Sequence, residues 1–390
     1  MQLSRRITGI TQGGSDGWDV YYRANRLSDE GLDITHLTIG EHDIGTDRSI
    51  LDAMHAATLA GHTGYSAFNG KMNLRERVAR RVSERTGQPT TPDNVLVVPG
   101  GQAGLFATHH AACDEGDTAL YIDPYYATYP GTIRSVGARP LAIPARPERM
   151  FQPDPADIAP HAAGASSLLI NSPNNPTGVN YSRDTLMGIA HICQEHALWL
   201  ISDEVYDTQL WHGQHISPRT LPRMEAQTLV IGPLSKSHAM TGSRIGWVVG
   251  PEEAIEHMGN LATHTTYGVA GFVQEAACFA LDRGPEFEAM IAAPFRRRRD
   301  LVLRLLEGQN TVRPIPADGA MYVMLDIRAT GLSGEDFANR LLDTNLVAVM
   351  PGESFGQAAA GHVRVALTVD DERLAEAVGK LVSLAQNLTA

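Results

Sequence analysis

Short apolar runs and helical patterns alternate through the middle of the chain. The runs are five or six residues long, and the stretches between them have apolar positions at helical spacing, as in "RDTLMGIAHICQEHA". Such alternation is typical of a mainly parallel sheet covered by helices. We therefore predict an α/β fold with strands at 94–99, 119–123, 166–171, 198–202 and 228–232.

One further apolar run, at 245–250, follows the strand at 228–232 closely. The short connection leaves no room for the crossover helix that a parallel neighbour requires. We therefore expect this strand to lie antiparallel to the one beside it.

The pattern of apolar and polar positions changes near residue 286. The basic helical pattern "FRRRRDLVLRLLEG" leads into shorter apolar runs at 321–327, 347–350 and 363–367 and further helical patterns. We expect the arginines at 296–299 on a solvated helix face. The chain is thus predicted to divide into an N-terminal arm (1–45), a large α/β domain (46–285) and a small α+β domain (286–390).

Composition narrows the class of protein. A length of 390 residues suits two packed units, and 43% hydrophobic with 19% charged residues is ordinary for a globular enzyme. The net charge of -12 argues against nucleic-acid binding, which needs a basic surface. We expect no membrane span and no secretory signal, because no apolar run has the length or place for either. Three scattered cysteines favour a reducing compartment, so a cytoplasmic address is expected.

Unusual polar residues follow three consecutive predicted strands. The segment "NSPNNPTG" (171–178) follows the first, "DEVY" (203–206) the second, and "PLSKSHAMTGSR" (233–244) the third. Each alone has an ordinary explanation, such as a helix cap, a turn residue or a surface charge. Because ligands bind beyond the carboxyl ends of strands in open α/β sheets, the three together predict a site.

A glycine-rich turn supplies a place for a phosphate. In "PGGQAG" (99–104) the turn joins a strand to a helix, whose first backbone N–H groups are free to bind an anion. The spacing differs from the dinucleotide fingerprint G-x-G-x-x-G. A lysine, a carboxylate to keep a ring nitrogen protonated, and a phosphate cradle are together what pyridoxal phosphate requires.

These motifs resemble those of the class I/II pyridoxal-phosphate-dependent aminotransferases (aspartate aminotransferase superfamily, fold type I). The resemblance runs from "LTIGEHD" (37–43) through the three strand-end motifs to "VRVAL" (363–367). It implies a large domain with a mainly parallel central sheet and a smaller α+β C-terminal domain. Two positions depart from the usual pattern: Pro233 replaces a serine, and Ser243 replaces a tryptophan.

The resemblance also implies a role for each matching residue. Lys236 would hold the cofactor aldehyde and act as acid and base, with Asp203 at the pyridine nitrogen. The implied substrate contacts are Arg364 at the α-carboxylate, with Asn175 and Gly40 beside it. The implied cofactor contacts are Tyr206 and Asn175 at the ring hydroxyl oxygen, Tyr126 stacked on the ring, Ser235, Arg244, Gly101 and Gln102 at the phosphate, and Tyr65 reaching the phosphate of a neighbouring subunit.

The family implies ping-pong transamination by a homodimer with shared active sites. Local strings, among them "SKSHAMTG" and "IRATGLSGEDFANRLLD", are most similar to the arginine–pyruvate transaminase branch. That branch suggests a basic or bulky amino donor and pyruvate as acceptor. Asp19, Glu41 and Asp43 are candidate partners for a cationic side chain, although a solvated loop carboxylate is the more ordinary interpretation of each.

Other functions stay open on the sequence alone. A pyridoxal-phosphate lyase or racemase would use the same lysine, aspartate and arginine. A regulatory binding module would need a basic DNA-binding extension, and the 40 N-terminal residues are too short and insufficiently basic. The histidines of "HGQH" (212–215) could suggest a metal hydrolase, but a surface loop explains them better, and we expect no metal site.

Overall fold

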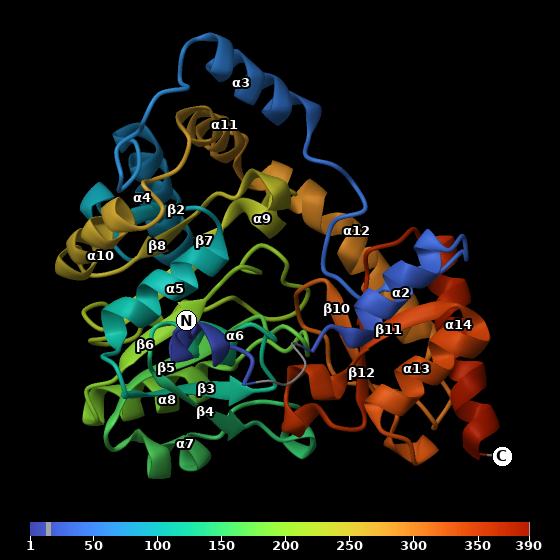
Figure 1. Cartoon of the computed structure of the whole chain (residues 1–390). Helices are drawn as coiled ribbons and strands as arrows, with labels where there is room; N and C mark the ends of the chain where they lie inside the picture. The colour runs from blue at the N-terminus through green and yellow to red at the C-terminus, as the bar shows by residue number, and fades with distance from the viewer. Residues whose placement is uncertain (13–16, 390) are drawn as a thin grey trace.

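Two sheets organise the chain (Figure 1). The structure, a computed structural model, describes residues 1–12 and 17–389. The larger sheet has seven strands in the order β2-β8-β7-β6-β5-β3-β4. Its strands are β2 (Val95–Val98), β3 (Thr118–Asp123), β4 (Arg139–Pro144), β5 (Ala165–Asn171), β6 (Trp199–Asp203), β7 (Thr228–Pro233) and β8 (Gly246–Val249).

Strand directions in this sheet agree with the sequence prediction. Strands β4, β3, β5, β6 and β7 run parallel, whereas β8 is antiparallel to both β7 and β2. The run at 245–250 is therefore antiparallel, as its short connection required. Because β5, β6 and β7 are neighbours, their carboxyl ends meet along one edge of the sheet.

Helices cover both faces of the large sheet, because its strands carry apolar side chains on alternating sides. Leu168 and Ile170 of β5 pack with one helix layer, and Leu169 between them packs with the other. On one face lie α5 (Gly101–Ala112), α6 (Tyr129–Ser135) and α10 (Glu252–His264). On the other lie α3 (Arg48–Leu59), α4 (Met72–Thr86), α7 (Pro155–Ala162), α8 (Arg183–Glu195) and α11 (Gly271–Leu281).

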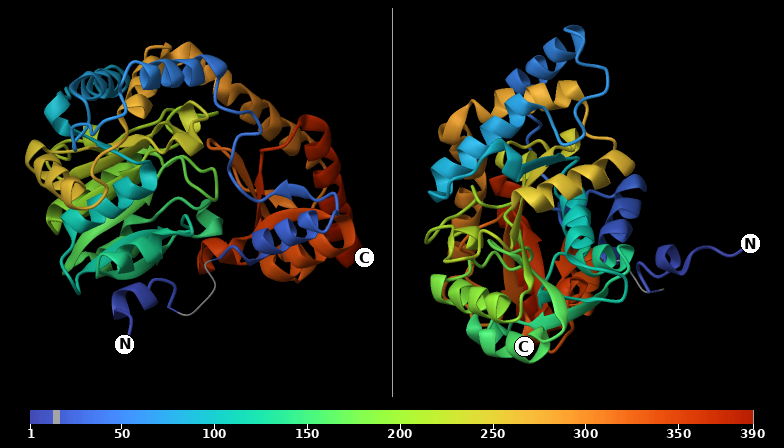
Figure 2. Two further views of the ribbon diagram at one scale, coloured as in Figure 1. Left: turned by 45° about the horizontal axis from the view of Figure 1, so that its top comes forward. Right: turned by 90° about the vertical axis from the view of Figure 1, so that its left-hand side faces the viewer.

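The smaller sheet has five strands in the order β1-β11-β12-β10-β9. They are β1 (Thr35–Leu37), β9 (Arg313–Pro314), β10 (Tyr322–Asp326), β11 (Val347–Pro351) and β12 (His362–Ala366). Around it pack α2 (Asp19–Asp29), α12 (Gly284–Leu305), α13 (Gly334–Asn345) and α14 (Asp371–Thr389). In Figures 1 and 2, α12 runs from the large unit to the small one.

The N-terminal segment divides between the two units. Helix α1 (Arg5–Thr8) lies beside α6, where Arg134 donates a hydrogen bond to the carbonyl of Ile10 at 2.6 Å. Helix α2 and β1 instead join the small unit, and β1 pairs with β11 in parallel. The sequence showed no strand in this segment, and a three-residue strand gives too little periodicity to detect.

The expectation of a solvated face at 296–299 is wrong for two of the four arginines. Arg296 and Arg297 are exposed, but Arg298 is buried and binds Asp43 and Asp371. The Arg299 side chain is only 13% exposed and donates to the carbonyl of Ala317 at 3.0 Å. No helix among the described residues is both long and apolar enough to cross a bilayer.

Candidate active site

A cavity of about 280 Å³ lies at the carboxyl ends of β5, β6 and β7. Eleven of the residues that the sequence predicted for one site line it. They are Gly40, Gly101, Gln102, Tyr126, Asn175, Asp203, Tyr206, Ser235, Lys236, Arg244 and Arg364. The three strand ends therefore meet at a cavity, to which the small unit contributes Arg364 from β12.

Lys236 lies in α9 (Leu234–Ser237), the single turn after β7. Its amine donates a hydrogen bond to the carbonyl of Gly40. Burial lowers the pKa of Lys236 to about 8, and the positive charges of Arg364 and Arg244 act in the same direction, against the carboxylate of Glu41. The chain has two other lysines, Lys71 and Lys380, and both form ion pairs away from the cavity.

Asp203 ends β6 and is buried. Tyr129 donates its hydroxyl hydrogen to one carboxylate oxygen at 2.8 Å, and the backbone N–H of Val205 donates to the other at 3.3 Å. Burial raises the pKa of Asp203 to about 6, although the Tyr129 hydroxyl opposes the rise. Within residues 1–12 and 17–389 this carboxylate has no cationic partner, so it offers a negative charge to a ligand.

Arg364 is 1% exposed and projects from β12. Its guanidinium lies between the rings of Tyr322 and Phe355, at 4.2 and 4.3 Å from their centroids. It donates to the Oδ1 of Asn175 at 2.7 Å and to the carbonyl of Thr38, while its Nε has no partner. No carboxylate in the described part of the chain pairs with it, so a ligand carboxylate could bind there.

A tyrosine pair connects the two units at the cavity wall. Tyr206 donates its hydroxyl hydrogen to the hydroxyl of Tyr322 at 3.1 Å. Asn175 accepts from Arg364 through Oδ1, which leaves its Nδ2 as a donor. The loop before it is fixed by Asn171, which accepts from the backbone N–H of Asn175 at 2.7 Å and donates to the carbonyl of Asp203 at 2.8 Å.

The other end of the cavity suits a phosphate. The N-terminus of α5 begins at Gly101 and has no side-chain cap, so its backbone N–H groups are available to an anion. Gly100 has φ 83°, and a Cβ there would lie 2.3 Å from a guanidinium nitrogen of Arg244. Glycine is therefore required where this arginine crosses the turn. Ser235 and Gln102 line the same end of the cavity.

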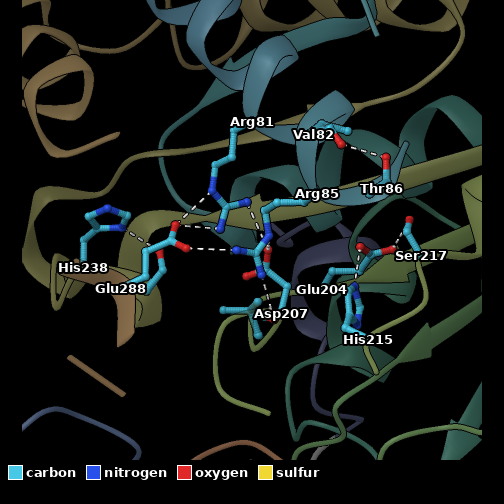
Figure 3. Close-up of polar contacts among 12 residues, drawn as sticks. Arg81, Val82, Arg85, Thr86, Glu204, Asp207, His215, Ser217, His238 and Glu288 are labelled. Carbon is cyan, nitrogen blue, oxygen red and sulfur yellow. Dashed lines mark hydrogen bonds and ion pairs between the residues drawn. The ribbon is translucent and has the colours of Figure 1, made fainter. Parts of the chain in front are cut away.

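An ion-pair cluster outside the cavity holds the segment that follows β6 (Figure 3). Arg81 and Arg85 of α4 both bind Asp207 and Glu288, with N–O distances of 2.9 to 3.4 Å. Because Asp207 directly follows Tyr206, the cluster fixes the turn that carries this tyrosine. Arg81 lies between both carboxylates, and their charges raise its pKa against the effect of burial.

Three sequence candidates, Tyr65, Asp43 and Asp19, do not line this cavity. Tyr65 is 90% exposed and contacts the ring of Tyr267, with centroids 5.1 Å apart. Asp43 is bound by Arg298, so that carboxylate already has a cationic partner. Of the other two acidic candidates, Glu41 lines the cavity and accepts from Thr241 at 3.1 Å, whereas Asp19 lines an adjoining cavity of about 1140 Å³.

The sequence reasoning missed several residues of the site. Tyr129 lies three positions after Tyr126 in the same strand-end segment, so the strand-end rule could have found it. Tyr322 had no signal, because its place beside Arg364 depends on the register in which β10 pairs with β12. Trp18, Asn171 and Thr241 also line the cavity. The "HGQH" segment is separate from it: His215 binds Glu204 at 2.9 Å (Figure 3).

Comparison with known proteins decides the family. The family described as aminotransferase class I and II matches residues 33–381. The chain belongs to this family. It is 42% identical over 388 residues to the arginine–pyruvate transaminase AruH of Pseudomonas aeruginosa, covering 99% of this chain and 98% of the relative. It is 35% identical to the aspartate/prephenate aminotransferase of Thermus thermophilus, covering 96% and 97%.

Solved structures agree with this assignment. The aspartate aminotransferase of Thermus thermophilus with maleate superposes with a TM-score of 0.92 at 33% identity, covering 98% of this chain and all of the other. The aspartate aminotransferase of Thermotoga maritima also gives 0.92, at 29% identity and full coverage of both chains. The fold is therefore that of the fold type I aminotransferases, and the chain is an aminotransferase, as the motifs predicted.

Proposed function

We propose that this aminotransferase uses pyridoxal phosphate, held in the cavity by Lys236. The charges of the cavity carry the proposal: Lys236, Arg244 and Arg364 are three cations with no carboxylate bound to them in the described residues, against the anions Asp203 and Glu41. A phosphate near Arg244 and a substrate carboxylate at Arg364 would neutralise this excess. A protonated ring nitrogen would supply the cation that Asp203 lacks.

The remaining contacts fit the same group. Tyr206 and the Nδ2 of Asn175 would donate to a ring oxygen, and Tyr126 would face the ring. Ser235 and the backbone N–H groups of Gly101 and Gln102 would hold the phosphate. The alignment of these donors around one 280 Å³ cavity supports the roles that the sequence resemblance implied.

In this mechanism each residue has a defined task. Arg364 binds the α-carboxylate, and its position between two aromatic rings orients the guanidinium before the substrate arrives. When bound, pyridoxal phosphate would withdraw electrons from the α carbon and carry the amino group between the half-reactions. Lys236 removes the α proton at its Nζ and returns it as a general acid; a pKa of about 8 leaves part of the amine unprotonated near neutral pH.

For substrates, we propose arginine or another basic amino acid as donor and pyruvate as acceptor. The support is the 42% identity to an arginine–pyruvate transaminase over nearly the whole chain. The cavity also has room for a long side chain, since Trp18 and Gln102 line both it and the larger adjoining cavity. Glu41 would be the carboxylate nearest to such a side chain inside the smaller cavity.

Single-turnover absorbance of the pyridoxal-phosphate-loaded protein tests this proposal. Arginine should convert the cofactor chromophore faster than aspartate or phenylalanine does, and pyruvate should restore it. No response to arginine would contradict the donor assignment. Conversion of an amino acid without any response to a 2-oxo acid would instead indicate a lyase or racemase.

We further propose a homodimer with shared active sites in a reducing compartment such as the cytoplasm. The exposure of the Tyr65 ring supports this proposal, since the ring is available to a second subunit, and isologous dimers are the commonest assembly. Cys113, Cys193 and Cys278 are buried and unpaired, as is usual where disulfides do not form.

A further inference from the structure

One segment contacts both the side-chain amine and the backbone carbonyl of Lys236. Residues 38–46, which we name the strap, connect β1 of the small unit to α3 of the large unit. The strap carbonyl of Gly40 accepts from the Lys236 amine, and the ring of His42 bonds the Lys236 carbonyl at 3.1 Å. The side chain and the main chain of position 236 are thus held by residues two apart in sequence.

The His42 contact has only one chemical form. A backbone carbonyl can only accept, so the Nε2 of His42 must carry the hydrogen. The ring is buried against the edge of Phe295 with centroids 5.1 Å apart, and its Nδ1 has no partner. Burial and the nearby charge of Lys236 lower the pKa of His42 to about 4, so the ring is neutral at physiological pH and its Nε2–H is available as the donor.

The strap itself is anchored by three side-chain contacts. Asp43 binds Arg298 of α12, Glu41 accepts from Thr241 at 3.1 Å, and Thr46 donates to the carbonyl of Ala239 at 2.7 Å. A second donor, the amide of Gln209, also bonds the Lys236 carbonyl, at 3.3 Å. The main chain at position 236 is therefore held by two side-chain donors, one of them on the strap.

We propose that His42 is a positioning residue for Lys236, which keeps the lysine amine at the strap carbonyl of Gly40 and inside the cavity. The proposal rests on the proposed function, in which Lys236 is the reacting amine. Without the ring N–H, the Lys236 carbonyl would lose one of its two hydrogen bonds to side chains. The amine would then spend more time in solvent, away from Glu41 of the strap and from Arg364 and Arg244 on the other walls.

The test measures the amine directly, without cofactor. Full-length cofactor-free protein is acetylated with limiting acetic anhydride at a series of pH values, and the peptides of Lys236, Lys71 and Lys380 are quantified by mass spectrometry. In the wild type the reactivity of Lys236 should rise with a midpoint near pH 8. The other two lysines report whether each variant is folded and labelled evenly.

Three variants distinguish the loss of the His42–Lys236 hydrogen bond from a general loosening of the strap. In His42→Leu, which keeps an apolar contact with Phe295, the Lys236 midpoint should move upward by about 0.5–1 pH unit, because better solvation favours the charged amine. His42→Gln, whose amide can donate to the same carbonyl, should restore the wild-type midpoint. Thr46→Val removes a different strap hydrogen bond that does not involve Lys236, and should leave the midpoint unchanged.

Three outcomes would overturn the proposal: an unchanged midpoint in His42→Leu, no rescue by His42→Gln, or an equal shift in Thr46→Val. His42→Asn, whose shorter amide does not reach the carbonyl, gives the same test if the leucine variant does not fold. Failure of the proposed function is seen separately, since reductive trapping of pyridoxal phosphate on wild-type protein would then label a residue other than Lys236.

The loaded protein gives a second readout. The rate at which His42→Leu captures pyridoxal phosphate, followed by absorbance, should fall about three- to tenfold, in line with the loss of one buried hydrogen bond. His42→Gln should lie within about twofold of wild type. Equal capture rates in all variants would contradict a positioning role.

Discussion

Asp203 is a buried carboxylate whose charge lowers the stability of the cofactor-free protein. The fold buries this carboxylate with a tyrosine hydroxyl and a backbone N–H but no cation, and its pKa rises to about 6. Because an isolated aspartate titrates near 4, the folded protein binds a proton more tightly than the unfolded chain between these values. The charged form therefore destabilises the cofactor-free fold as the pH rises through about 6.

This sign leads to a prediction about Asp203→Asn. The variant lacks the buried charge, so above pH 6 its cofactor-free form should be more stable than wild type by about 2–3 kcal/mol. Below about pH 4 the difference should vanish, because the wild-type carboxyl is then protonated in both states. Urea unfolding at pH 4 and pH 7.5 checks this, with Asp29→Asn as the control, because Asp29 is an exposed carboxylate at the end of α2. A variant less stable than wild type at pH 7.5 would contradict the account.

The same substitution should be harmful to activity. An amide cannot stabilise a protonated ring nitrogen as a carboxylate does, so kcat should fall by about 10²-fold or more. A gain in stability with a loss of activity would show that Asp203 serves cofactor binding and does not stabilise the fold. Retained activity would remove its proposed role.

At the scale of elements, α12 holds the site from two directions. Near its beginning, Glu288 binds the two arginines of α4 that also hold Asp207 (Figure 3). Further along, Arg298 binds Asp43 of the strap. One helix thus connects the segment that carries Tyr206 with the segment that carries His42.

Glu288→Gln should therefore destabilise the protein markedly. The change leaves Arg81 and Arg85 with one buried carboxylate between them, and breaking a buried ion pair costs about 3–5 kcal/mol. Asp52→Asn, which breaks the exposed pair with Arg48, should change the free energy of unfolding by less than about 0.5 kcal/mol. Equal effects of the two variants in urea unfolding would show that the cluster gives no structural support.

The sequence was sufficient to predict which strand ends meet, but not where α12 begins. The order of apolar runs was sufficient to predict adjacent parallel strands and hence the meeting of Asn175, Asp203 and Lys236, since one rule about strand ends connects them. The start of α12 was not predictable in the same way. The helix begins at Gly284 and contains Pro294. Because a proline is usual at the start of a helix and rare inside one, the sequence pattern indicated a helix from 295 onward.

Other parts of the site depend on tertiary contacts without a local signature. The two carboxylate partners of Arg298 lie more than 70 positions away in the sequence, so its burial could not be seen in a run of four arginines. Tyr322 stands beside Arg364 only through the register of two antiparallel strands. The strap contact of His42 likewise joins residues 194 positions apart.

At the scale of the whole molecule, the proposed shared site makes a prediction about mixed dimers. Lys236→Ala removes the reacting amine, and Tyr65→Ala removes the side chain offered to the partner. If Tyr65 serves the other subunit, a mixed dimer of the two variants contains one site with both residues intact. Activity should then recover to about a quarter of wild type when the variants are mixed in equal amounts, since about half of the dimers are mixed and each has one good site.

Subunit exchange of differently tagged variants measures this recovery. Each variant alone should have little activity, and the tags allow the mixed dimer to be purified. Activity of the mixture equal to the mean of the two separate variants would contradict a shared site. A mixture of Lys236→Ala with Asp203→Asn is the control, because both residues belong to one cavity and a mixed dimer restores neither site.

The central claim is that Lys236 is the residue to which the cofactor binds covalently, and reductive trapping tests it most directly. The protein is loaded with pyridoxal phosphate, reduced with borohydride and digested, and the modified peptide is identified by mass spectrometry. The chain has only three lysines, Lys71, Lys236 and Lys380, and digestion places them on separate peptides, so the labelled peptide identifies the residue. We expect stoichiometric label on the peptide that contains Lys236; label on either other lysine, or no label, would contradict this role of Lys236.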